Sequence, residues 1–236
     1  MAVILKDGTI FLHVPKTGGN WVTTVLERCG LIRGYIGHKH ANVDRLLAPV
    51  VPNGRRPVRY FNGRRPASYF RIRRIRKCLS PKPFMFCFVR HPLSWYESYF
   101  KYMSDPIRQW GDWGDEKDMF DWHPKAALNG CGDSNFGTFV RKAIAKRPGY
   151  VTELFGSFAQ PQVDFVGTQE NLRQDLMKVL RMLRLDFDED LVENSDPVGV
   201  SHPPPGQVVE WEPRLREEVL QLERVALVRY GYLPPQ

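Results

Sequence analysis

The pattern of apolar residues changes from that of a strand to that of a helix within the segment Thr9-Ile-Phe-Leu-His-Val-Pro-Lys-Thr-Gly-Gly-Asn-Trp21. Residues 9–14 are a run of mostly apolar, β-favouring side chains, which predicts a buried strand. Apolar side chains then recur on one helical face over 20–29, and Gly30 is a natural C-terminal stop. The proline and the two glycines over 15–19 predict a turn between them. The segment therefore predicts a strand, a glycine-containing loop and a helix.

The same order of elements recurs further along the chain. Residues 84–89 predict a second buried strand, followed by a helix that opens at Pro92. A third strand is predicted over 163–168 with a helix after it; Ser134 is expected to cap a further helix, and a last one opens at Pro213. This alternation predicts an α/β fold with a mostly parallel central sheet, helices on both faces, and ligands at the carboxyl ends of the strands.

Size and composition indicate one domain. The chain has 236 residues, of which 42% are apolar and 25% are charged, so we expect a single domain over 1–236. Residues 53–77 hold ten Arg or Lys and no Asp or Glu, and we interpret them as a basic insertion. Residues 104–133 carry three tryptophans among many Asp and Gly without a clear period, and we interpret them as an irregular excursion.

The sequence shows no pattern of a membrane helix or a secretory signal. The longest apolar run, 84–89, has six residues, whereas a helix that spans a bilayer needs roughly 20. We therefore expect a cytoplasmic protein with no integral membrane segment. The four cysteines form no C-x-x-C pair, so we expect reduced thiols and no metal site.

The loop over 15–19 has the composition of an anion-binding site. It lies where a strand turns into a helix, so free backbone N–H groups and the positive end of the helix dipole converge there. Gly18 and Gly19 let the backbone approach an anion closely, and Lys16 can reach a terminal phosphate or sulfate. A P-loop NTPase places its lysine after the glycines, followed by a Ser or Thr that holds Mg²⁺. In this chain Lys16 precedes the glycines and is followed by Thr17 and Gly18. The Mg²⁺-binding hydroxyl of the P-loop motif therefore has no counterpart.

This loop also resembles a known family motif. Pro15-Lys-Thr-Gly-Gly-Asn-Trp21 resembles the 5′-phosphosulfate loop of the sulfotransferases that use 3′-phosphoadenosine-5′-phosphosulfate (PAPS), written P-K-[ST]-G-[GT]-[TSN]-[WS], and matches it at every position. The resemblance implies that Lys16 contacts the leaving phosphate and the sulfuryl group, that Asn20 and the loop N–H groups bind the 5′-phosphate, and that Trp21 stacks on adenine. The donor-binding residues implied by this motif are Pro15, Lys16, Thr17, Gly18, Gly19, Asn20 and Trp21.

A second motif, Phe86-Cys-Phe-Val-Arg-His-Pro-Leu-Ser-Trp-Tyr-Glu-Ser-Tyr-Phe100, is similar to the 3′-phosphate signature of the same family. Arg90 ends the strand and Ser98 follows eight residues later on the helix, so both can hold one phosphate. A looser likeness over 163–172 implies that Thr168 lies beside the nucleotide. The late R-K-G triplet by which cytosolic members hold the 3′-phosphate is absent, and residues 194–206 are the candidate replacement.

The resemblance implies an enzyme that moves a sulfuryl group from PAPS to a hydroxyl or amine and releases 3′-phosphoadenosine-5′-phosphate (PAP), without a metal. Saccharides, lipid-linked sugars, small natural products and peptide tyrosines are all compatible acceptors. An anionic acceptor would suit the basic segment 53–77.

Histidine is the expected general base, because imidazole accepts a proton near neutral pH. The segment Gly37-His-Lys-His-Ala41 is similar to one that is common in carbohydrate-modifying members of the family, which favours His40 as the catalytic base. His38 and His202 are alternatives, and a carboxylate such as Glu97 is a further one. His13 is expected to lie in the first strand, and His91 to order the turn before the second helix.

Two other classes of function remain as alternatives. A kinase-like phosphoryl transferase would need Mg²⁺ and ATP. A nucleic-acid-binding module is suggested by the basic residues of 53–77 with their interleaved aromatic side chains, but no recognisable module surrounds them, and we expect no nucleic-acid partner.

Overall fold

The computed structural model describes residues 2–37, 40–47, 82–105, 110 and 124–234. The basic segment 53–77, His38 and most of the excursion over 104–133 lie outside these residues. The strands are β1 (Ala2–Leu5), β2 (Ile10–Leu12), β3 (Ile32–Ile36), β4 (Met85–Val89) and β5 (Phe165–Thr168). The helices are α1 (Gly19–Arg28), α2 (Val43–Leu47), α4 (Pro92–Met103), the 3₁₀ helix η1 (Pro124–Leu128), α5 (Phe136–Lys146), α6 (Tyr150–Phe158), α7 (Leu172–Met182), α8 (Glu189–Asn194), α9 (Pro213–Leu222) and α10 (Arg224–Arg229).

The strands form one mixed sheet in the order β3-β1-β2-β4-β5. The neighbours β2, β4 and β5 are parallel, whereas β1 is antiparallel to both β2 and β3. The predicted parallel arrangement is therefore confirmed for the three predicted strands, but the sheet as a whole is mixed. A tight turn at Gly8, with φ of 96°, joins β1 to β2, and the Asp7 carboxylate accepts hydrogen bonds from the N–H and hydroxyl of Thr9 at 3.0 and 2.7 Å.

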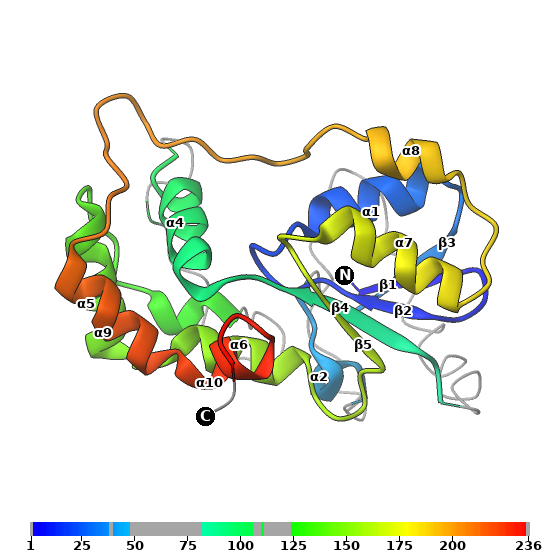
Figure 1. The fold of residues 1–236 in the computed structure, drawn as a ribbon, viewed down its shortest axis with the longest axis horizontal. Coiled ribbons are helices and arrows are strands. Elements are labelled where there is room, and N and C mark those ends of the chain that lie inside the picture. Colours follow the sequence, from blue (N-terminus) through cyan, green and yellow to red (C-terminus); the bar gives the residue numbers. More distant parts are fainter. Residues whose placement is uncertain (1, 38–39, 48–81, 106–109, 111–123, 235–236) are drawn as a thin grey trace, which may run out of the picture.

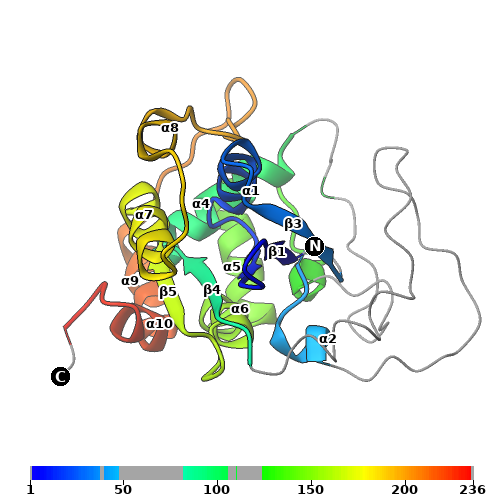
Figure 2. The same ribbon diagram turned by 90° about the vertical axis from the view of Figure 1, so that its right-hand side faces the viewer.

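Helices cover both faces of the sheet, as predicted. In both views α1 and α7 lie together on one face, and α6 and α10 lie on the other (Figures 1 and 2). Alternate side chains of β4 enter separate cores. Phe86 and Phe88 pack with α1 and α7, whereas Cys87 and Val89 pack with the helices of the opposite face.

Two predicted helix boundaries were wrong. Asn135, not Ser134, caps α5, because its side-chain oxygen accepts the N–H of Thr138 at 2.9 Å. The predicted last helix is two helices that meet at Glu223. This residue is fully buried, and its carboxylate accepts the N–H groups of Val151 and Thr152 at 3.0 and 2.7 Å, at the start of α6. The break between α9 and α10 thus places the Glu223 carboxylate at the positive N-terminal end of α6.

No helix in the described ranges combines the length and the apolar character that a bilayer crossing requires.

Candidate functional site

The carboxyl ends of β2 and β4 lie side by side, and the chain leaves them toward opposite cores. From β2 it continues into α1, which packs with Phe86 and Phe88, and from β4 into α4, whose Trp95 and Phe100 pack in the other core. Such a switch point is where open α/β sheets bind ligands. The loop over 15–18 and Arg90 therefore meet at the position that the fold favours for a site.

Glycines set the shape of the loop. Gly18 precedes α1 with φ of 83°, and a Cβ atom on it would lie 2.5 Å from the side chain of Leu172. A Cβ atom on Gly19 would overlap the ring of His13. Leu172 and His13 therefore fill the space that a side chain would need at these two residues, so the loop requires glycine at both. The N-cap residue of α1 is Gly18, which has no side chain with which to cap the first turn.

Lys16 has φ of 66°, which is uncommon for a residue with a Cβ atom. The conformation costs roughly 1–2 kcal/mol, and such strain clusters at functional sites. Neighbouring groups hold the loop in place: Trp95 Nε1 donates to the Pro15 carbonyl at 2.9 Å, and the Thr17 hydroxyl donates to the Val14 carbonyl at 3.1 Å. Thr17 is thus buried and engaged within the loop.

Arg90 directly follows β4, and its side chain contacts the same loop. Its Nη1 donates to the Lys16 carbonyl at 3.4 Å. Among the described residues, no acceptor reaches its Nε, which is buried. Burial lowers the pKa of the Arg90 guanidinium, and the negative charge of Glu170 opposes this shift. A partly desolvated guanidinium that has N–H donors without an acceptor binds anions strongly.

Ser98 and Thr168 occupy different surroundings. Ser98 lies on the half-exposed side of α4, one turn beyond Ser94. Thr168 pairs with Val89 at the end of β5, and its N–H and hydroxyl donate to Asp175 at 2.8 and 3.4 Å. It is therefore one strand further from the loop than Arg90.

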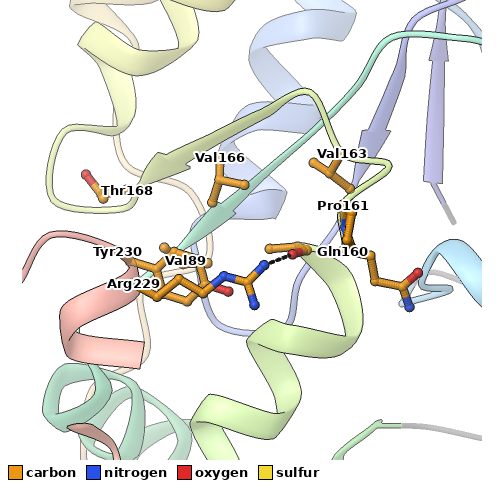
Figure 3. Close-up of a pocket in the computed structure, with 9 residues that line it drawn as sticks. Val89, Gln160, Pro161, Val163, Val166, Thr168, Arg229 and Tyr230 are labelled. Atoms are coloured by element: carbon orange, nitrogen blue, oxygen red, sulfur yellow. Dashed lines mark hydrogen bonds between the residues drawn. The ribbon is translucent and has the colours of Figure 1, made fainter. Parts of the chain in front are cut away.

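Thr168 also borders a hollow of about 380 Å³ between the sheet and α6 and α10. Figure 3 shows Thr168 at one end and Pro161 at the other, with the Arg229 side chain crossing to the Ala159 carbonyl at 2.7 Å. The hollow opens on the face of the sheet opposite α1, so it is separate from the loop over 15–18.

The segment 195–199 lies along α1. The Ser195 carbonyl accepts Trp21 Nε1 at 3.4 Å and Arg173 Nη2 at 2.7 Å. A Cβ atom on Gly199 would lie 3.0 Å from the side-chain nitrogen of Asn20. Figure 1 shows this segment passing from α8 above α1. Of the candidate replacement for the absent triplet, residues 194–206, the part over 195–199 therefore lies beside α1.

Trp21 is enclosed by these contacts. Its side chain is 4% exposed, and the Arg173 guanidinium lies 5.5 Å from its ring centroid. The Nε of Arg173 is buried without an acceptor among the described residues. Sequence reasoning did not find Arg173, because it follows a loose motif and reaches the site only through the packing of α7 against α1. Stacking of adenine on Trp21 would require Arg173 or the segment 195–199 to move.

His40 contacts His13, two residues before the loop over 15–18. Its Nδ1 lies 3.0 Å from the His13 carbonyl, and the two imidazole rings are 4.9 Å apart. A carbonyl only accepts, so Nδ1 carries the proton in a neutral ring and Nε2 carries the lone pair. His13 is buried one residue beyond β2, so the prediction that it lies in the strand was wrong by one residue.

The other described candidates have different positions. His91 caps α4, because its Nδ1 accepts the N–H of Leu93 at 3.3 Å, which confirms the prediction that it orders this turn. His202 is exposed within the segment that follows α8. Glu97 accepts Trp211 Nε1 at 2.8 Å.

The described part of the chain holds no group of three metal-ligating side chains. Within it, Cys29, Cys87 and Cys131 form no disulfide. Burial raises the pKa of the Cys87 thiol to about 12, which makes it unreactive.

Comparison of the chain with protein-family models, with curated proteins and with solved structures found no match.

Proposed function

We propose that this chain is a sulfotransferase that moves a sulfuryl group from PAPS to a hydroxyl or amine of an acceptor and releases PAP. The contact of Arg90 Nη1 with the Lys16 carbonyl carries the proposal. It joins two segments, 74 residues apart, that separately resemble the two phosphate motifs of one family. If the two resemblances arose by chance, nothing would require the two segments to lie in contact. Their contact therefore supports a common function for both motifs.

The residues present fit the two phosphate groups of the donor. The first turn of α1, with Gly18 and Gly19, suits the 5′-phosphosulfate, because backbone N–H groups point outward there. Arg90 suits the 3′-phosphate, because its buried Nε can still donate. Ser98 is proposed as a second donor to that phosphate, and Thr168 as a neighbour of the nucleotide.

In the proposed reaction, the acceptor oxygen forms a bond to sulfur while the bond from sulfur to the 5′-phosphate oxygen breaks. PAP leaves with that electron pair, and the acceptor proton passes to His40 Nε2. We propose a saccharide or glycolipid as the acceptor, because the His-Ala segment that contains His40 resembles that of carbohydrate-modifying members. Lys16 and the loop N–H groups supply positive charge at the leaving phosphate.

The role of Arg90 is testable with nucleotides alone. PAP and 5′-AMP differ by the 3′-phosphate, and hydrogen bonds to a charged group contribute about 1.5–3 kcal/mol. We expect Arg90→Gln to weaken PAP binding about 10–100-fold and to leave the weaker 5′-AMP binding unchanged. Isothermal titration calorimetry measures both. Arg141→Gln is the control, since this exposed arginine on α5 pairs with Glu212. Equal losses for PAP and 5′-AMP would contradict the assignment.

A further inference from the structure

The chain turns sharply at the end of α10, and this turn sets the position of Tyr232. Gly231 has φ of 78°, a left-handed conformation that glycine adopts without strain. The N–H groups of Gly231 and Tyr232 donate to the carbonyls of Val228 and Leu227 at 3.2 and 2.8 Å, which are the two hydrogen bonds of a Schellman motif. The backbone of Tyr232 is therefore fixed to the last turn of α10.

The side chain of Tyr232 contacts residues that follow two neighbouring strands of the sheet. Its hydroxyl donates to Glu170 Oε2 at 2.7 Å, and its ring centroid lies 5.1 Å from that of His91. The other carboxylate oxygen, Glu170 Oε1, accepts the backbone N–H of His91 at 2.9 Å. Burial and the hydrogen bond to Glu170 raise the pKa of the Tyr232 hydroxyl, so this group donates as a neutral phenol. Each oxygen of the Glu170 carboxylate thus accepts one hydrogen bond.

These hydrogen bonds keep a carboxylate near Arg90 without an ion pair between them. The N–H that Glu170 accepts belongs to the residue directly after Arg90. Burial lowers the pKa of the Arg90 guanidinium, and the charge of Glu170 opposes this effect. In the described part of the chain, however, the guanidinium donates to the Lys16 carbonyl and to no carboxylate, and its Nε has no acceptor. Glu170 therefore lies close to Arg90 but directs its oxygens to other donors.

A carboxylate in this position competes with a phosphate for the guanidinium once it is free to turn, because both anions pair with arginine in the same way. We propose that Tyr232 is a positioning residue that holds the Glu170 carboxylate away from Arg90, so that the guanidinium stays open to the 3′-phosphate of the donor. This inference rests on the proposed function. Tyr232 acts through Glu170 and needs no contact with the nucleotide.

Tyr232→Phe removes the hydroxyl, keeps the ring and frees one oxygen of Glu170. If the freed carboxylate occupies Arg90 in about nine molecules of ten, the apparent affinity for PAP falls about tenfold. We expect titration calorimetry to show this loss for PAP and unchanged binding of 5′-AMP, which lacks the 3′-phosphate. Tyr230→Phe is the matched control, because it removes a hydroxyl without a partner among the described residues from the same segment. It should change neither affinity.

Glu170→Gln separates this role from a purely structural one, because glutamine lacks the charge that would pair with Arg90. Added to Tyr232→Phe, it should restore the PAP affinity of the wild type, and alone it should bind PAP at least as tightly as the wild type. Equal losses of PAP and 5′-AMP in Tyr232→Phe, no loss of PAP, or no recovery in the double variant would each overturn the inference, as would weaker PAP binding by Glu170→Gln alone. The proposed function would stand in all these cases if the wild type binds PAP, whereas a wild type that does not bind PAP would overturn both.

Discussion

His40→Ala is expected to lower the turnover number for sulfuryl transfer about 10²–10⁴-fold, the contribution of a positioned general base. The reason is geometric. His40 Nδ1 lies 3.0 Å from the His13 carbonyl, which fixes the ring beside the loop and leaves the lone pair on Nε2. The base contacts the acceptor and not the nucleotide, so PAP binding should stay near that of the wild type. Transfer of label from PAPS to an acceptor found by screening measures the turnover.

His38→Ala is the matched control for His40, because both residues belong to the same short segment. It should lose much less activity. The opposite ranking would assign the base to His38, and full activity in both variants would remove the role from this segment and direct the next test to Glu97 or His202.

Lys16→Ala should lower turnover about 10²–10³-fold, the usual effect of removing one group aimed at developing charge. Its ammonium group lies 4.1 Å from the ring centroid of Tyr102. The loss should appear in the turnover number more than in the Michaelis constant for the acceptor, because the leaving phosphate gains charge in the transition state. A variant within threefold of the wild type would contradict the placement of the loop.

A companion variant separates catalysis from folding. Lys16→Gly removes the Cβ atom from a residue with φ of 66°, so it relieves backbone strain that Lys16→Ala retains. We expect Lys16→Gly to melt at or above the temperature of Lys16→Ala while being equally inactive. Calorimetric melting of the two proteins measures the difference.

The fold around the loop was predictable because its signals are local. The strand predicted over 9–14 is β2 (Ile10–Leu12), and the helix predicted over 20–29 is α1 (Gly19–Arg28). Proline and glycine mark the turns, and each apolar pattern has a single period. Two antiparallel pairings were missed. The Asp-Gly turn before Thr9 was an available hairpin signal for β1, whereas β3 has Gly34 at its centre, and glycine in a strand interior weakens the strand signal.

The site was predictable only in part, for a different reason. Lys16, Arg90 and His40 stand in short motifs, and the structure brings the loop close to both Arg90 and His40. Arg173 belongs to no motif. It reaches Trp21 because α7 packs beside α1, and such long-range packing leaves no local pattern in the sequence.

Binding of PAP in the presence of EDTA tests the central claim most directly. Lys16, Arg90 and the amides at the start of α1 supply positive charge that a kinase would take partly from Mg²⁺. We expect titration calorimetry to show PAP binding that is unchanged when EDTA replaces Mg²⁺, and binding of Mg-ATP that is much weaker. Tight binding of Mg-ATP, with no binding of PAP in EDTA, would contradict the assignment as a sulfotransferase.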